Sequence, residues 1–469
     1  MPDIFDPRPE KSDSYPATTV LSGPALWRRS WSFPERVNIR RTWPVLFFIV
    51  VGILFCRLPS AVVQANFYAE DSIVFFKQQY EQGFFPALFT HYGGYLHFMP
   101  RILAAICSML PLPYAPQAFA VASLVVASVT LTFFFASGFR SVINHDLLRA
   151  GIVIIFTLMP NADSLMKLAY VNWFMVVFIV LVTIFTLPQG TVARWLFFIP
   201  VAAAVWSTPV AIVCLPVVGL RAWEAADRRE RLWWLALALV IVAYAFTEER
   251  PPSLLPTLLH EPAGKWALVH ALGYRVFHFF FAGEYLSYPW PDEGWKIMTL
   301  ISCVLAAICA IGTILAVLRT SGSGSVRRVP LVLFYLILST SAMFVLRTGG
   351  WHFFLDWNSD AWDANGRFFY CSTILLCVLW GVIYERVLRD WITAKAFRRA
   401  TAILLLMGWL SLHQLGFKLH GWHSQVSWQQ STREILAAET RARKTGQSEI
   451  VHVQTALFGF DFDLNIKPN

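Results

Sequence analysis

The chain carries at residues 297–318 the uncharged apolar stretch IMTLISCVLAAICAIGTILAVL. An α-helix needs roughly 20 apolar residues to cross the hydrocarbon core of a bilayer, which is about 30 Å thick. Similar apolar blocks lie at 43–65, 115–137, 170–187, 232–247, 329–346, 367–384 and 400–417. We therefore expect an all-α protein that crosses a membrane several times.

The composition supports this fold class. Hydrophobic residues make up 57% of the 469 residues and charged residues 14%, whereas a soluble domain has about 45–50% and about 25%. The net charge is +9, and the basic residues lie mostly in the amino-terminal tail and in short loops. This distribution is typical of topology signals and gives no reason to expect a nucleic-acid partner. The seven cysteines all fall in apolar blocks without metal-ligand spacing, so we expect neither a disulfide framework nor a cysteine metal site.

Two further regions are harder to assign. Residues 150–160 are short for a full crossing, and residues 195–220 carry Ser207-Thr208-Pro209 in the middle of an apolar run. Proline disfavours an uninterrupted helix, so we predict a hairpin of two short helices there. Short helices at membrane depth are tolerated where they line a cavity enclosed by protein. With these regions the sequence predicts about 11 crossings, in a range of about 10–13.

Basic residues predict the orientation. Most of the 38 Lys and Arg residues lie in six segments, which are 1–42, 138–149, 188–194, 221–232, 319–328 and 385–399. Because such residues favour the cytoplasmic side, we expect the amino terminus inside and the carboxyl terminus outside. We expect a cytoplasmic tail at 1–42 and a membrane domain at 43–417. Three large outer loops of this domain lie at 66–100, 248–296 and 347–366. A small outer appendage follows at 418–469. In the appendage, 424–447 are helix-prone and 449–466 strand-like.

Two adjacent carboxylates, Glu70 and Asp71, follow the first apolar block. Charged groups at this depth are costly unless they face a cavity or a partner, which makes the pair a candidate for function. A solvated helix start, favoured by the helix dipole, explains the pair about as well.

The run HYGGYLHFMPR at residues 91–101 strengthens the functional interpretation. It places His97 and then Arg101 at the head of an apolar helix, where an arginine can pair with a phosphate through two hydrogen bonds. Asn172 and Trp173 open a later span and could offer a hydrogen bond and a stacking face to a sugar. Snorkelling of the arginine, and capping or anchoring by the Asn-Trp pair, are the structural alternatives.

Two more outer regions carry candidates. Arg275 lies in the loop 248–296, and Arg367 with Tyr370 lies at the outer end of a late span. Arg367 suits an anionic headgroup, with interfacial snorkelling as the alternative. The acidic residues of the loop 347–366 do not match a calcium loop. No nucleotide-binding loop occurs on the inside, so a lipid-borne substrate at the outer face fits better.

Taken together, these motifs resemble the GT-C superfamily of integral membrane glycosyltransferases. The resemblance rests on five features: Glu70-Asp71, the run from Gly93 to Arg101, Asn172-Trp173, the run from Gly366 to Tyr370, and the small appendage. It implies transfer of a sugar from a polyprenyl-phosphate carrier to a glycan or lipid acceptor at the outer face, in cell-surface glycan assembly. It also implies that Asp71 or Glu70 acts as the base, in a multi-pass protein of the inner (plasma) membrane. The chain lacks the large soluble domain of many relatives, which leaves the acceptor open.

This chemistry agrees with the residues themselves. A carboxylate would deprotonate the acceptor hydroxyl, and Arg101, Arg275 or Arg367 would stabilise the leaving phosphate. No cofactor is expected, and a divalent metal is optional. The alternatives are a transporter or flippase of lipid-linked saccharides, or a polysaccharide polymerase or ligase. A transporter typically shows polar groups at mid-membrane and paired halves, whereas Arg57 is the one charge well inside a predicted span.

Overall fold

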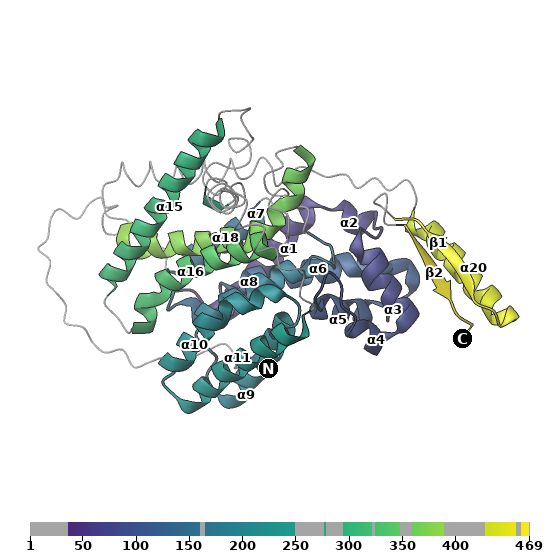
Figure 1. Ribbon diagram of the computed structural model, residues 1–469, viewed down its shortest axis with the longest axis horizontal. Helices are drawn as coiled ribbons and strands as arrows, with labels where there is room; N and C mark the ends of the chain where they lie inside the picture. The colour runs from purple at the N-terminus through teal and green to yellow at the C-terminus, as the bar shows by residue number, and fades with distance from the viewer. Residues whose placement is uncertain are drawn as a thin grey trace, which may run out of the picture.

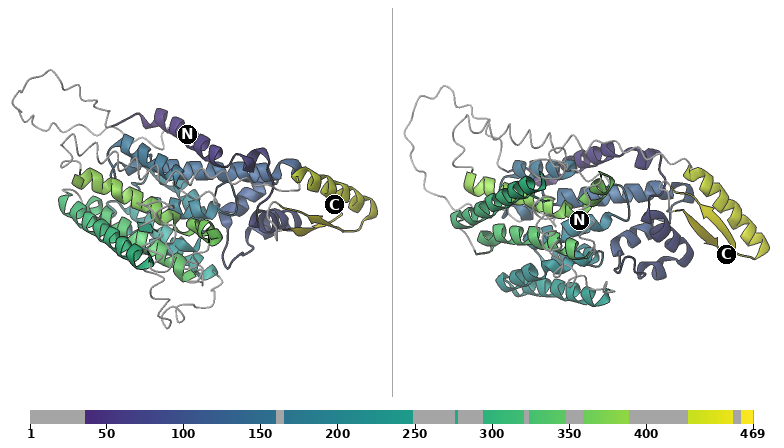
Figure 2. Two further views of the ribbon diagram at one scale, coloured as in Figure 1. Left: turned by 90° about the horizontal axis from the view of Figure 1, so that it is seen from above. Right: turned by 45° about the horizontal axis from the view of Figure 1, so that its top comes forward.

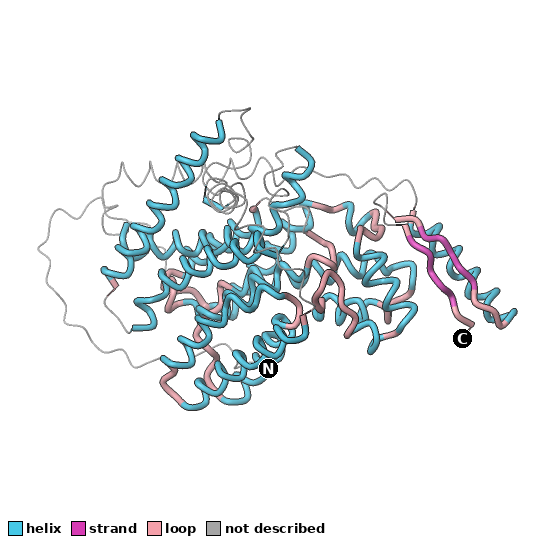
Figure 3. The backbone as a smooth tube through the Cα atoms, viewed as in Figure 1, coloured by secondary structure: helices cyan, strands magenta, loops and turns pink. Residues whose placement is uncertain are grey.

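The computed structural model describes residues 36–159, 165–248, 276–277, 294–320, 324–347, 359–388, 427–455 and 461–468. Within these ranges the chain is mostly helical, with one two-stranded sheet (Figure 1, Figure 3). The first half contains α1 (Ile39–Arg57), α2 (Ser60–Val63), η1 (Asp71–Phe76), α3 (Lys77–Gln82), α4 (Phe84–Leu88), α5 (Phe98–Cys107), η2 (Leu112–Tyr114), α6 (Ala115–Phe133), η3 (Ser137–Phe139), α7 (Asp146–Leu158) and α8 (Val171–Ile184). The second half contains α9 (Thr191–Val205), η5 (Pro209–Cys214), α10 (Leu215–Glu224), α11 (Arg228–Thr247), α15 (Gly294–Arg319), α16 (Gly324–Arg347), α18 (Ser359–Ile383), η7 (Tyr384–Leu388), α20 (Trp428–Thr445), β1 (Glu449–Val453) and β2 (Phe462–Ile466).

Six of the described helical segments are long and apolar enough to cross a membrane. They are Ile39–Arg57, Leu112–Phe133, Arg228–Thr247, Leu300–Arg319, Val326–Met343 and Phe369–Leu388. Each overlaps one of the apolar blocks predicted from hydropathy, so the multi-pass membrane class is confirmed. The first block ends earlier than predicted, at Arg57 rather than residue 65, because Pro59 disfavours helical backbone at the residue before it.

The shorter predicted segments also form helices. α9 ends at Val205 and η5 begins at Pro209, so the predicted break of the 195–220 region at Ser207 and Thr208 is confirmed. The predicted segment 150–160 is the end of α7, a helix of 13 residues.

The helix α8 is the centre of the bundle. Every one of its 14 residues except Trp173 is buried. At about 1.5 Å per residue the helix is only about 21 Å long, shorter than the hydrocarbon core. Protein rather than lipid surrounds it, which makes so short a helix tolerable. The turn that precedes it, residues 165–170, is buried too, so its backbone amides require partners within the protein.

Contacts between loops gather the segments into two groups. The first group is joined by the pairs Val37–Asp146, Asn144–Glu385, Thr320–Arg386, Glu224–Arg328 and Arg194–Asp227. All of these residues belong to the six Lys/Arg-rich segments found in the sequence. The segments that share a charge bias therefore meet at one end of the bundle.

The second group lies at the other end of the bundle. It is joined by the pairs His91–Thr247, Met99–Ser207, Tyr95–Asn172, Asp71–Leu168 and Leu112–Trp428. This end includes the loop 66–100 and the carboxyl-terminal appendage. The appendage extends from the bundle beside α3, on the side away from α15 and α16 (Figure 1, Figure 2).

The appendage forms the predicted helix, α20, and the predicted strand-like stretch forms an antiparallel pair in which Val451 faces Leu464. The buried ring of Trp428 packs edge-on against Phe67 and Phe76, at centroid distances of 4.7 and 5.4 Å. The Tyr80 hydroxyl donates a hydrogen bond to Glu439 of α20. The appendage therefore packs against the loop 66–100.

Replacing Trp428 with alanine is expected to undock the appendage. Removing a buried aromatic side chain typically costs about 3–5 kcal/mol, and here the loss falls on the contact with Phe67 and Phe76. Hydrogen exchange of the α20 amides should accelerate, while exchange in α18 stays unchanged. Ile450→Ala, at a position that is 73% exposed, is the control. Unchanged protection of α20 in Trp428→Ala would contradict this interface.

Some predictions lie outside the described residues. These are most of the tail 1–42, the segment 400–417, most of the loops 248–296 and 347–366, and Arg275.

Candidate functional site

The loop 66–100 enters the site through an unusual backbone. Asp71 begins η1, a π-type helix of six residues, a form often found at functional sites. Ala69, two residues earlier, has a φ of 44°, and Met166 on the facing turn has a φ of 54°. They are the two non-glycine residues with positive φ in the described ranges. Such backbone is strained for both residues, so the surrounding packing must hold this junction in place.

Asp71 connects the loop to the buried turn before α8. Its side chain is only 4% exposed. The Leu168 N–H donates to Oδ2 at 2.9 Å and the Ala169 N–H donates to Oδ1 at 2.6 Å. Burial raises the pKa of Asp71 to about 7, and the charge of Glu70 adds to this rise, while the two N–H bonds and Lys167 oppose it. A carboxylate held rigidly with such a pKa is suited to general-base catalysis near neutral pH.

Lys167 is a site residue to which sequence reasoning gave no role. Its buried ammonium lies 3.6 Å from the ring centroid of Tyr68 and 5.2 Å from that of Tyr170. These are cation–π distances, and the charge acts on the neighbouring Asp71. The sequence signal that could have identified it is its position as the single basic residue of the short loop 161–169.

Glu70 differs from its neighbour Asp71 in its surroundings. It is half-buried, and its Oε2 atom is buried without a hydrogen-bond partner in the part of the chain that the structure describes. Together with burial, which contributes more, its charge raises the pKa of Tyr92. Glu70 therefore lies near the aromatic residues of the 91–97 run.

His97 is surrounded by aromatic rings. It stacks on Tyr95 at a centroid distance of 4.1 Å and lies 5.6 Å from Tyr92 and 5.7 Å from Phe75. The loop closes on itself through a bridge between Tyr92 and Tyr95, with Gly93 and Gly94 at positive φ in the turn. Aromatic faces arranged in this way could also stack on a sugar ring.

Arg101 is a buried cation that contacts no carboxylate in the part of the chain that the structure describes. Its side chain is 2% exposed, Nη1 donates to Gln78 Oε1 at 2.9 Å, and the guanidinium lies 5.6 Å from the Phe75 centroid. Nε and Nη2 are buried without a partner among the described residues. A buried charge without a compensating partner is costly, so this side chain is prepared for an anion.

Asn172 completes the group. Its Nδ2 donates to the Tyr95 hydroxyl at 2.9 Å, and its buried Oδ1 has no partner in the described ranges. Five predicted residues are thus brought to the outer end of α8: Glu70, Asp71, His97, Arg101 and Asn172. Trp173 lies half-buried at the same helix end.

The remaining predicted residues are Tyr370, Arg367 and Arg275. Tyr370 is packed in the bundle core, where its hydroxyl donates to the Phe156 carbonyl at 3.1 Å and its ring contacts Phe174. This position gives Tyr370 a packing role. Arg367 belongs to α18, but its side chain is outside the described residues, as is all of Arg275.

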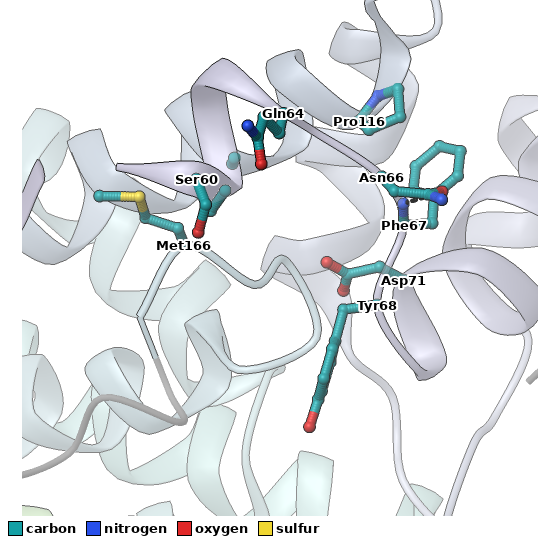
Figure 4. Close-up of a pocket in the computed structure, with 10 residues that line it drawn as sticks. Ser60, Gln64, Asn66, Phe67, Tyr68, Asp71, Pro116 and Met166 are labelled. Atoms are coloured by element: carbon teal, nitrogen blue, oxygen red, sulfur yellow. Dashed lines mark hydrogen bonds between the residues drawn. The ribbon is translucent and has the colours of Figure 1, made fainter. Parts of the chain in front are cut away.

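A small pocket adjoins Asp71 (Figure 4). It is lined by Ser60, Ala61, Gln64, Asn66, Phe67, Tyr68, Asp71, Pro116, Ala120 and Met166. In Figure 4 the Asp71 carboxylate points towards this space, whereas the Tyr68 ring turns away. Among the described residues, no group of three or more His, Cys, Asp or Glu side chains could hold a metal ion.

The fold and the site define a multi-pass, mostly helical membrane protein with a polar cluster at one end of its bundle. A scan against protein-family models finds no match to the chain, and a search of curated proteins finds no significant relative.

Proposed function

We propose that this protein is a membrane glycosyltransferase that takes a sugar from a polyprenyl-phosphate carrier. The observation that carries this proposal is that a buried cation and a fixed carboxylate lie together at the amino-terminal end of α8. Arg101 is buried and has no anion in contact among the described residues, and Asp71 is a fixed carboxylate whose pKa is about 7. Phosphate release and hydroxyl deprotonation require one group of each kind. The resemblance to the GT-C superfamily supports the same assignment.

The reaction balances with these groups. The acceptor hydroxyl oxygen attacks the anomeric carbon of the donor sugar and forms the new glycosidic bond. The bond between that carbon and the phosphate oxygen breaks, and its electron pair leaves with polyprenyl phosphate. Asp71 takes the hydroxyl proton, and the free N–H groups of Arg101 stabilise the charge on the phosphate. Glu70 orients the site or binds a second hydroxyl.

One assay separates this proposal from its alternatives. Purified protein should release polyprenyl phosphate from a labelled polyprenyl-phosphate sugar when a glycan or lipid acceptor is present. A flippase would instead move the intact labelled lipid across a vesicle bilayer without releasing it. A polymerase or ligase would transfer a whole lipid-linked repeat. Recovery of only intact lipid-linked sugar would rule out the glycosyltransferase.

We propose about 11 crossings with the amino terminus in the cytoplasm. The loop contacts support this arrangement, because the segments rich in Lys and Arg meet at one end of the bundle, and the loop 66–100 and the appendage meet at the other. The hairpin of α9 with η5 and α10 supplies two crossings, and its turn at Ser207 meets Met99 at the outer end. The appendage, joined to Leu112 by Trp428, shares that end.

A reporter that is active only outside the cytoplasm is therefore expected to work when fused after Asn469. The Lys/Arg-rich segments should face the cytoplasm, and the appendage belongs to the opposite group of loops. The same reporter inserted between Asp227 and Arg228 should be silent. Activity of the internal fusion with silence of the carboxyl-terminal one would invert the proposed orientation.

A further inference from the structure

Two environments that differ in charge lie along the π-helix η1. Near its carboxyl end, Phe75 contacts His97 and Arg101, and Nε and Nη2 of Arg101 have no partner among the described residues. At its amino end, Asp71 borders the small pocket between α2 and α6. No residue that lines the pocket is basic, and an anion placed there would meet the Asp71 carboxylate. The pocket therefore suits a neutral group.

The lining of this pocket offers hydrogen bonds of the kind that hydroxyl groups use. The Ser60 hydroxyl and the Gln64 amide both line it, and in the described structure neither side chain makes a hydrogen bond. Each Asp71 oxygen accepts one backbone N–H and keeps a second lone pair. Figure 4 shows the carboxylate directed into the space between Ser60, Gln64 and Asn66. A hydroxyl in the pocket would thus reach a proton acceptor and neutral polar partners together.

The pocket also lies beside a candidate membrane span. α2 follows α1 after two residues, and α6 is a membrane-spanning candidate. Val63, next to Gln64, is 71% exposed, as expected of a residue that faces lipid. A ligand anchored in the outer leaflet of the bilayer would therefore reach the pocket from the membrane surface.

We infer that this pocket is the acceptor subsite and that it receives the reacting hydroxyl of a neutral, polyhydroxylated group such as a sugar headgroup. The inference rests on the proposed function and adds the chemical class of the acceptor. The anionic donor binds at Arg101, near the other end of η1, and Asp71 removes a proton from the hydroxyl in the pocket.

Two photoactivatable probes can test this in full-length protein held in lipid nanodiscs: an alkyl glucoside, which is neutral, and an alkyl phosphate. The glucoside should label the segment 60–71. Ala61→Trp fills the pocket and should reduce this labelling about tenfold or more, while Val125→Trp, at an exposed position of α6, should not. Gln64 is exposed, so Gln64→Leu keeps the fold and should reduce labelling several-fold. Labelling by the alkyl phosphate should persist in Ala61→Trp and fall in Arg101→Lys.

The outcomes separate the two proposals. Unchanged glucoside labelling in both Ala61→Trp and Gln64→Leu overturns the acceptor subsite, as does capture of the alkyl phosphate by the segment 60–71. If labelling by the alkyl phosphate does not depend on Arg101, the result counts against the glycosyltransferase. The glucoside labelling then decides separately whether the pocket binds a neutral hydroxyl ligand. Competition by soluble methyl glucoside as strong as that by octyl glucoside identifies a free sugar. Competition by octyl glucoside alone identifies a membrane-anchored one, and both results support a neutral hydroxyl ligand.

Discussion

Replacing Asp71 with asparagine is expected to lower the rate of sugar transfer by about 10²–10⁴-fold, the usual cost of losing a general base. The carboxylate is fixed by two backbone N–H groups, borders the pocket and has a pKa of about 7. Asparagine keeps the shape and removes the base. Turnover and donor binding should be measured together, and near-normal turnover in Asp71→Asn would remove Asp71 from the base role.

The same variant has a structural cost that needs its own control. Both Asp71 oxygens accept backbone N–H groups, and asparagine offers only one oxygen. An amide N–H of the buried turn then loses its acceptor, which costs about 1–3 kcal/mol. Asp146→Asn is the matched control, because Asp146 is also buried and also accepts a backbone N–H, from Val37. It should lower thermal stability without lowering turnover per folded molecule.

The pH profile distinguishes Glu70 from Asp71. A base must be ionised, so turnover should fall as the pH drops below about 7, the pKa of Asp71. The charge of Glu70 contributes to that raised pKa, and Glu70→Gln should therefore move the acid limb to lower pH while activity persists. If Glu70→Gln alone abolishes turnover and still binds donor, the two roles are exchanged.

The helices were predictable because apolar blocks of sufficient length have few alternatives in a membrane protein. The break at Ser207 followed from Pro209, and the start of α8 followed from the polar Asn172 at the edge of an apolar run. The early end of α1 has a local cause as well, Pro59, which the hydropathy of the block concealed. Local sequence features thus predicted most of the helices and where they end.

The site was predictable only in part because its contacts are distant in sequence. That Glu70 and Asp71 differ could be argued from adjacency, but the partners of Asp71 lie 97 and 98 residues away. The strained backbone at Ala69 and Met166 has no sequence signature, since neither residue favours positive φ. The contacts of Tyr370 were not predictable for a related reason. An aromatic near a span end can line a site, anchor an interface or fill a core, and the partners of Tyr370, the Phe156 carbonyl and the Phe174 ring, are distant in sequence.

Replacing Arg101 with lysine is expected to weaken donor binding by about 10–100-fold. Lysine keeps the positive charge but loses the planar fork that can grip a phosphate through two N–H groups. The structure leaves Nε and Nη2 of Arg101 buried and without partners among the described residues, so these are the groups that donor binding would satisfy. Charge-assisted hydrogen bonds contribute about 1.5–3 kcal/mol each, which sets the size of the effect.

The affinity for polyprenyl phosphate should be measured alone, since this product carries the anion without the sugar. Arg194→Lys is the control, because Arg194 pairs with Asp227 at the opposite end of the bundle and should leave the affinity unchanged. Arg101→Met goes further, because it removes the charge from a site that has no counter-ion among the described residues. That variant should be at least as thermally stable as the wild type while failing to bind polyprenyl phosphate. Loss of stability in Arg101→Met together with unchanged affinity in Arg101→Lys would assign the guanidinium to packing against Phe75 and Gln78, and the phosphate would have to bind elsewhere.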